Sequence, residues 1–314
     1  MAESVLNPAL VSSNSGYTHP RYAEALHSFG NPFALPGCEG HLLARSISDT
    51  AYQDAMGLYP LFVCPNWKEV GNDLEGVRED WISVTLVVDP FAPSNAALEA
   101  QGFDIVQPFK AHWLVDLRVS YEEATSKHHR YYTRRAARDG VEVDRVAPCE
   151  EQLEVWTRMY GHLIDRHDIT GIQAFSRASF RKQFAVPGLV LFVAKHHGEP
   201  VGMHLWYEMG EVAYSHLAAC NSTGYDTQAS YALHKAAADY FRPRVTWLNL
   251  GGGAGTSSDE VDGLARFKKG WATTSAPARL CGRILQPAIY KKLTRNHDRQ
   301  DATYFPKYRD GELV

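Results

Sequence analysis

The stretch Val245–Trp271 constrains the fold of this chain most strongly, because an apolar segment in it leads directly into a glycine-rich turn. Val245–Leu250 is apolar and rich in β-branched residues, which is typical of a short buried strand. Four glycines follow within five residues: Gly251, Gly252, Gly253 and Gly255. One glycine would indicate only a tight connection. Four indicate a backbone that another group approaches closely.

A helix is expected after this turn. Ser257, Ser258 and Asp259 can cap a helix that begins near Glu260. Leu264, Phe267 and Trp271 then share one face, and Arg266, Lys268 and Lys269 project from other sides. The sequence GGGAGTSSDE has neither the GK[ST] ending of a Walker loop nor a G-x-G-x-x-G register. The glycines therefore do not predict a nucleotide-phosphate loop of either type.

Length, charge and cysteine usage limit the class of protein. The 314 residues suffice for one large or two ordinary domains, and 45% hydrophobic with 22% charged residues is ordinary for a globular chain. A net charge of -4 argues against broad non-specific nucleic-acid binding but allows a local basic patch. The five cysteines are scattered and no C-x-x-C occurs, so neither a disulfide framework nor a zinc site is expected. Without an apolar run of membrane length or a signal-peptide pattern, a cytoplasmic protein with no membrane contact is expected.

The chain predicts an alternation of strands and helices after an irregular arm at residues 1–35. The expected strands are Leu61–Cys64, Trp81–Val88, Ala111–Leu117, Leu189–Ala194, Val201–Tyr207, Val212–Ala219, Val245–Leu250 and Arg279–Leu285. The expected helices are Tyr121–Arg138, Glu150–Asp165, Ser176–Phe184 and Gln228–Phe241. Val201–Tyr207 and Val212–Ala219 should pair antiparallel, with Val245–Leu250 parallel beside the latter and splayed from it at one end.

This order of elements resembles the GNAT acyltransferase fold, and three phrases resemble its Fem-like peptidyltransferase branch. The phrases are KAHWLVDL, KHHRYYTRRAARDGVEVDRV and LNLGGG…DGLARFKKGW, and the resemblance covers roughly residues 110–285. It implies an α+β chain of two tandem GNAT-like halves, the N-terminal one degenerate. The implied organisation is an arm at 1–35, a degenerate half at 36–118, an acyltransferase domain at 119–290 and a tail at 291–314.

The resemblance further implies acyl transfer to an amine, without a metal, a permanently bound cofactor or a covalent enzyme intermediate. Fem-like enzymes take the acyl group from aminoacyl-tRNA, whereas ordinary GNAT enzymes take it from acyl-coenzyme A. The stretch Cys220–Gln228, where a coenzyme A loop would lie, has one glycine, no basic residue and Asp226. It therefore favours aminoacyl-tRNA, with an acyl-CoA-dependent N-acyltransferase or a non-catalytic binding protein as alternatives. The acceptor is a small molecule, a secondary-metabolite intermediate or a peptidoglycan precursor, and the oligomeric state stays open.

Three residues are the catalytic candidates. Lys268 falls on the Lys of the family's "FK" motif, beside the acyl-transfer centre or the donor's phosphate. Tyr214 and His216 alternate along one strand and so share a face. His216 could take the amine proton, although a hydrogen-bonded buried histidine is an equal interpretation.

The candidate substrate-binding residues lie around this centre. Asn249 lies in the expected strand Val245–Leu250 just before the turn, and His204 and Trp206 share a face of the neighbouring strand. Arg166 and His167 lie where such folds place an acceptor-side lid. The full set is Asn249, Gly251, Gly252, Gly253, Phe267, Arg266, Trp206, His204, Tyr225, Arg166 and His167.

A basic helix is the candidate surface for tRNA. Arg130, Arg134, Arg135 and Arg138 lie on it with Lys127, and two tyrosines stand between them. Such a charge run is usually a solvated face. In an acidic chain, contact with nucleic-acid phosphates or with a phosphorylated acceptor is a competing interpretation.

Overall fold

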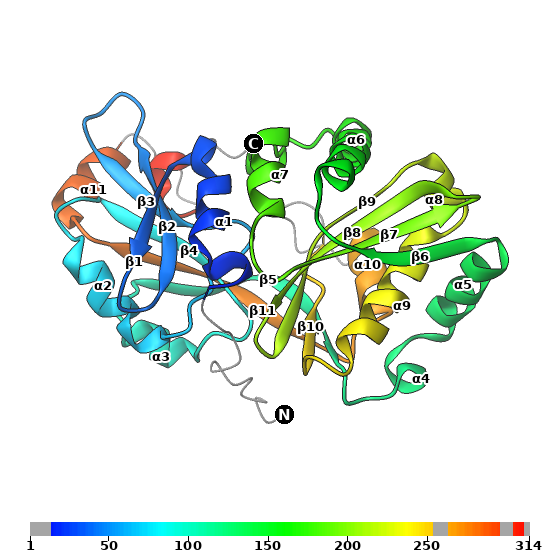
Figure 1. Cartoon of the computed structure of the whole chain (residues 1–314). Helices are drawn as coiled ribbons and strands as arrows, with labels where there is room; N and C mark the ends of the chain where they lie inside the picture. The colour runs from blue at the N-terminus through cyan, green and yellow to red at the C-terminus, as the bar shows by residue number, and fades with distance from the viewer. Residues whose placement is uncertain (1–13, 254–262, 296–303, 311–314) are drawn as a thin grey trace. The chain divides into compact units, whose positions relative to one another are not determined.

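A computed structural model describes residues 14–253, 263–295 and 304–310, and they form two compact units (Figure 1). Gly255 and the expected capping residues Ser257, Ser258 and Asp259 lie outside the described residues. Tyr17–Phe109 and Pro277–Val314 belong to the first unit, and Asn14–Gly16 with Lys110–Ala276 to the second. This division differs from the expected boundaries, because the C-terminal strand pairs within the first unit.

The first unit contains five strands in the order β1-β2-β3-β4-β11. They are β1 (Asn31–Leu35), β2 (Gly40–Ser46), β3 (Gln53–Gly57), β4 (Ser83–Val88) and β11 (Thr274–Ile284), all antiparallel except β3 with β4. Its helices are α1 (Pro20–Ala25), α2 (Val70–Gly76), α3 (Asn95–Glu99) and α11 (Pro287–Thr294). The sequence prediction was wrong twice here. Residues 20–35 form α1 and β1, and Leu61–Cys64 contributes only an isolated bridge, between Phe62 and Val88.

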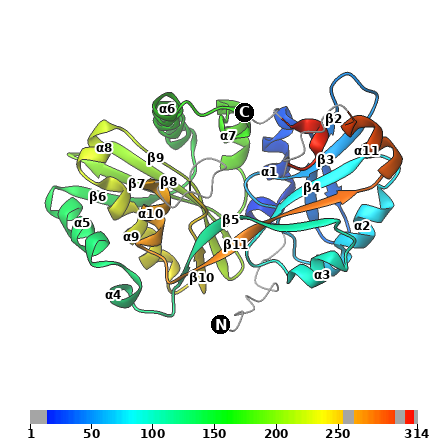
Figure 2. The same cartoon turned by 180° about the vertical axis from the view of Figure 1, so that it is seen from behind.

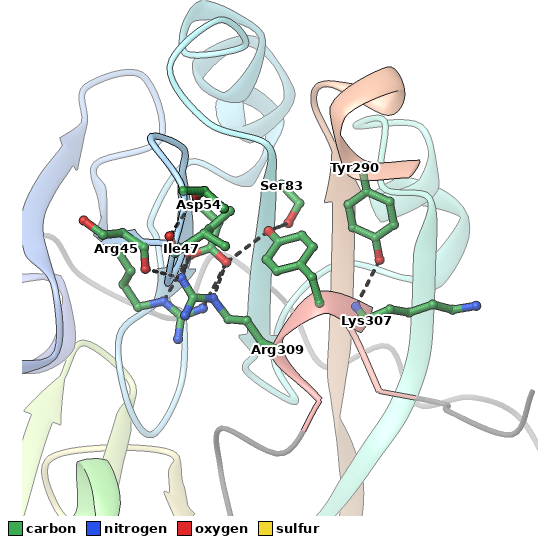
Figure 3. Close-up of polar contacts among 10 residues, drawn as sticks. Arg45, Ile47, Asp54, Ser83, Tyr290, Lys307 and Arg309 are labelled. Atoms are coloured by element: carbon green, nitrogen blue, oxygen red, sulfur yellow. Dashed lines mark hydrogen bonds and ion pairs between the residues drawn. The ribbon is translucent and has the colours of Figure 1, made fainter. Parts of the chain in front are cut away.

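A buried ion pair fastens the C-terminal segment to this unit. Asp54 on β3 is fully buried, and Arg309 donates to it through Nε (2.5 Å) and Nη2 (2.9 Å). Arg45 on β2 donates to the same carboxylate at 3.2 Å (Figure 3). Tyr308 donates to Asp54 at 3.1 Å and lies 2.7 Å from the Ser83 hydroxyl.

The second unit contains strands in the order β5-β10-β9-β8-β7-β6, seen from behind in Figure 2. They are β5 (Ile105–Asp116), β10 (Trp247–Asn249), β9 (Val212–Cys220), β8 (Glu199–Met209), β7 (Leu189–His196) and β6 (Val141–Val146). The helices are α4 (Tyr121–Ala124), α5 (Lys127–Arg138), α6 (Glu150–His167), α7 (Arg177–Phe184), α8 (Ser222–Asp226), α9 (Ala229–Phe241) and α10 (Gly263–Lys269). No described helix is long and apolar enough to cross a membrane.

Helices cover both faces of these strands. On β9, Ser215 contacts His204, whose ring lies 4.6 Å from that of His234 on α9. The next residue, His216, contacts Gln183 on α7. On β8, Trp206 packs against Phe241 of α9, whereas the next residue, Tyr207, donates to Gln183 O on α7. Because successive strand residues point to opposite faces, α9 covers one face and α7 the other.

The pairing predicted around the glycine turn is confirmed. β8 and β9 pair antiparallel, and β10 runs parallel to β9 from Trp247↔Val212 to Asn249↔Tyr214. The β10–β9 ladder ends there, while β9 continues to Cys220. The predicted helix Tyr121–Arg138 is divided, because Ser126 caps a new helix by accepting from His129 N at 3.2 Å.

Candidate active site

Asn249 shapes the glycine turn at the end of β10. It is 2% exposed, and its Oδ1 accepts from Gly251 N (2.9 Å) and from His112 Nδ1 (3.0 Å). Gly251 has φ +76°, a conformation that glycine adopts without steric cost. Among the described residues Asn249 Nδ2 has no hydrogen-bond partner. The buried Oδ1 of Asn249 therefore stabilises the turn, and its Nδ2 group is a buried donor without a partner among the described residues.

Lys268 reaches back from α10 to this turn. Its Nζ donates to Gly252 O at 2.6 Å, and a Cβ added to Gly251 would lie 3.2 Å from it. The predicted direction of the side chain is confirmed, as expected for a helical side chain that leans toward the N-terminus. Phe267 anchors the helix against His234, with ring centroids 4.8 Å apart. Leu264, expected to help, is 42% exposed because the first turn of α10 does not face the core.

Two residues of β5 that were not predicted complete this centre. Lys110 packs against the turn so closely that a Cβ on Gly252 would lie 2.7 Å from its Cδ. Burial is the main cause that lowers the pKa of His112 to about 3, the Asn249 hydrogen bond opposes it, and the charges of Lys268 and Lys110 add to the lowering. His112 is thus a neutral imidazole that donates through Nδ1 and keeps an acceptor at Nε2. The alternation of Lys110 and His112 in KAHWLVDL was the available signal.

Tyr214 and His216 lie on β9, next to β10. Tyr214 pairs with Asn249 in the ladder and is 2% exposed. The β8–β9 register shifts from Leu205↔Leu217 to Trp206↔Ser215, which leaves His216 as the extra residue of a β-bulge. Its Nε2 donates to Gln183 Oε1 at 3.0 Å, and burial lowers its pKa to about 3. His216 is neutral and its Nε2 proton is engaged, so its role in proton transfer stays a prediction.

The other substrate-binding candidates lie on β8, α6, α8 and α10. His204 and Trp206 are fully buried beside α9, where they form an aromatic wall of the core. Arg166 stacks over the Tyr225 ring at 4.2 Å and so joins α6 to α8. His167 is exposed at the end of α6, and Arg266 is exposed on α10.

Two of the four arginines of α5 have partners within the protein, and the other two are exposed. Arg130 donates to the backbone oxygen of Glu122, and Arg135 pairs with Asp139 at 3.3 Å. Arg134 and Arg138 are exposed and have no ion-pair partner among the described residues. With Lys127 and Tyr131, which is 49% exposed, they follow the spacing of one helix face. We call Lys127, Tyr131, Arg134 and Arg138 the α5 stripe.

Comparisons with known proteins agree with this architecture. Residues 124–269 match the family model described as an acetyltransferase (GNAT) domain. The crystal structure of FemX superposes with a TM-score of 0.66 at 15% identity, covering 87% of this chain and 92% of that one. The C-terminal domain of a putative lysylphosphatidylglycerol synthetase from Agrobacterium fabrum gives 0.61 at 15% identity, covering 87% and 91%. L-PGS from Bacillus licheniformis gives 0.57 at 13% identity, covering 86% and 92%. No curated protein matches the chain.

The second unit therefore has a GNAT-like fold over residues 124–269. The chain as a whole has a fold like that of FemX, which superposes over most of both chains. In the part of the chain that the structure describes, no cluster of three His, Cys, Asp or Glu side chains could hold a metal ion.

Proposed function

We propose that this protein forms an amide by moving an aminoacyl group from aminoacyl-tRNA to an amine acceptor. The observation that carries the proposal is the contact of Lys268 with the glycine turn at the end of β10, in a Fem-like fold. The acceptor is a small molecule, such as a secondary-metabolite intermediate, or a peptidoglycan precursor.

The geometry suits attack of a neutral amine on an ester carbonyl. The amine nitrogen bonds to the carbonyl carbon, the ester bond to the tRNA 3′ oxygen breaks, and this oxygen leaves with the amine proton. The aminoacyl end can lie along the main chain of the glycine turn once the flexible Lys110 side chain, which packs over Gly252, moves aside. The Lys268 ammonium then stabilises the oxyanion or the terminal phosphate, a contribution that grows where water is excluded.

The neighbours of Lys268 fit a site for negative charge. The Lys110 side chain packs against the same turn, and its ammonium is near enough to lower the pKa of His112. His112 stays neutral and presents an acceptor at Nε2, which can orient an N–H of the incoming amine. Two cations also disfavour a protonated amine, so the reactive free amine is the form that this site favours.

Two features support tRNA as the donor. The α5 stripe offers three exposed cations and an exposed aromatic ring, a combination suited to phosphates and unstacked bases. In addition, the 220–228 stretch has no open glycine loop: Asn221 caps α8 by accepting from Gly224 N (2.9 Å). A Cβ on Gly224 would lie 2.1 Å from Val201 O, so α8 packs directly on β8.

An acyl-CoA-dependent N-acyltransferase is the second candidate, favoured by the acetyltransferase description of the matching domain model. The test incubates the protein with total tRNA charged with radiolabelled amino acids and a mixture of primary amines. We expect label in a product that survives mild alkali, which hydrolyses the aminoacyl ester but not an amide. Stoichiometric coenzyme A binding by calorimetry, together with label transfer only from acyl-CoA, would reject the tRNA donor.

A further inference from the structure

A closed ring of hydrogen bonds joins the first turn of α5 to the end of α10. Ser126 N donates to Gly270 O at 2.9 Å. The Ser126 hydroxyl lies 2.9 Å from His129 Nδ1, and His129 Nε2 lies 2.7 Å from Phe267 O. The ring links residues nearly 140 positions apart in the sequence.

The roles in this ring are fixed by chemistry. A carbonyl only accepts, so His129 Nε2 carries the proton and Nδ1 accepts from the Ser126 hydroxyl. The same hydroxyl oxygen accepts from His129 N as the helix cap. Burial is the main cause that lowers the pKa of His129, and it keeps the imidazole neutral. Every polar atom of the His129 ring is therefore engaged.

Close packing around the His129 imidazole holds it in one orientation. His129 is 5% exposed, and its centroid lies 5.1 Å from Tyr231 and 5.2 Å from Trp271. A Cβ on Gly270 would lie 2.0 Å from His129 Cε1, so only glycine fits there. The end of α10 therefore packs against α5 in one position.

We infer that His129 is a positioning residue that holds Lys268 at the glycine turn. The bonded carbonyl of Phe267 belongs to the peptide group that continues into Lys268, so the imidazole fixes the backbone from which that side chain reaches Gly252 O. His129 also lies in the first turn of α5, the helix that carries the α5 stripe. It connects the proposed tRNA-docking helix to the chemical centre, and its kinetic consequence rests on the proposed function.

The position of Lys268 can be measured without any substrate. Reductive methylation with ¹³C-formaldehyde gives each lysine a dimethylamino NMR signal, and Lys268→Arg identifies that of Lys268. We expect this signal to move to the shift of exposed lysines in His129→Ala. It should return toward the original shift in His129→Gln, whose amide can still donate to Phe267 O. His128→Ala, at the exposed neighbour, is the matched control and should leave it unchanged. An unmoved signal in folded His129→Ala would overturn the inference, whatever the protein catalyses.

Kinetics then test the consequence. With charged tRNA as donor, His129→Ala should lower kcat about tenfold to a hundredfold, the scale of a misplaced catalytic group, with little change in KM. The double variant with Lys268→Ala should be no slower than Lys268→Ala alone, because His129 acts through Lys268. A double variant whose loss of kcat is the product of the two single losses would contradict this. Full activity of Lys268→Ala would instead reject the proposed centre and leave the NMR result standing.

If His129→Ala does not fold, His129→Asn and His129→Gln replace it. The shorter Asn side chain cannot reach Phe267 O, whereas Gln can. A displaced Lys268 signal in His129→Asn with a restored one in His129→Gln supports the inference. Equal signals in both variants contradict it.

Discussion

Lys268 shows how a residue acquires a role from its surroundings. On an open helix face a lysine is solvated, but this one contacts the carbonyl of Gly252 and stands near three buried neutral histidines whose pKa values it lowers. Among the described residues, Lys268 and Lys110 both contact the turn and both carry positive charge. This pair of cations supports the proposal that negative charge develops at the turn.

Gly270 allows a test of the packing against His129. We expect Gly270→Ala to lower the free energy of unfolding by about 1–3 kcal/mol, because the new methyl group overlaps a ring that cannot move away. Gly161→Ala, inside α6 with open space around it, is the matched control and should raise it by about 0.5–1 kcal/mol. Urea unfolding measures both. Equal changes in the free energy of unfolding for the two substitutions would contradict the close packing of α10 against His129.

At the scale of elements, α5 has two different sides. One side, with His129 and Ala136, is buried, and the other carries the α5 stripe. Arg135, which the sequence grouped with the tRNA-binding arginines, is engaged with Asp139 and the Tyr132 ring. The stripe is consequently a more specific hypothesis than the whole basic helix.

Neutralising the stripe should weaken tRNA binding. The variant Lys127→Ala/Arg134→Ala/Arg138→Ala should show a shallower dependence of log Kd on log salt, by about two to three in slope, since each lost phosphate contact removes about one released counterion. Lys291→Ala/Lys292→Ala on α11 is the control for loss of exposed charge. Filter binding over a salt series measures the slope. An unchanged slope would make the stripe an ordinary solvated face.

Elements with strong local signals were predicted from the sequence, and those with weak ones were not. Glu150–His167 and the β7–β9 meander have clear periodicity and turn residues, and their predicted counterparts match to within a few residues. β1, β2 and β3 are short, and Pro32 interrupts the strand pattern of β1. Their ladders join sequence neighbours, but the buried Asp54 of β3 is paired with Arg309, 255 residues away, which local patterns cannot reveal.

At the scale of the whole molecule, the site depends on contacts between distant segments. His112 and Asn249 are 137 residues apart, and no local pattern joins them. The motif around Gly251 and Lys268 could be predicted because strand, turn and helix are consecutive. Lys110 and His112 could not be placed at the turn, because antiparallel pairing of β5 with β10 brings them there.

The C-terminal segment should stabilise the first unit through Arg309. Arg309→Met leaves the buried Asp54 carboxylate with the Arg45 ion pair and the Tyr308 hydrogen bond, so we expect a loss of about 3 kcal/mol in unfolding free energy. The exposed pair Arg78–Glu75 is the control, and Arg78→Met should cost at most about 1 kcal/mol. Urea unfolding of the full chain checks both. A loss no larger for Arg309→Met than for Arg78→Met would contradict a structural role.

The buried histidines predict acid sensitivity. Burial lowers the pKa of His112, His216 and His234 to about 3 each, below the ordinary value of about 6.5 in the unfolded chain. Above pH 6.5 these histidines are neutral in both states, and the free energy of unfolding is at its full value. It falls as the pH decreases from 6.5 toward 3, because the unfolded state binds more protons than the folded state in this range. Stability should fall by up to about 4 kcal/mol per pH unit near pH 5. His216→Asn should reduce this slope by about a third, whereas a pH-independent stability would contradict the neutral, buried state of all three.

The most direct test of the account is amide formation by Lys268→Ala at saturating acceptor, with aminoacyl-tRNA and with acyl-CoA as donors. Removing the ammonium should lower kcat about 10²-fold, the scale of one lost oxyanion donor, and leave the melting temperature nearly unchanged. Lys268→Arg should recover part of the rate, because it restores the charge but not its position. Wild-type turnover in Lys268→Ala, with activity lost in His216→Ala, would place the catalytic centre on β9 and contradict the account.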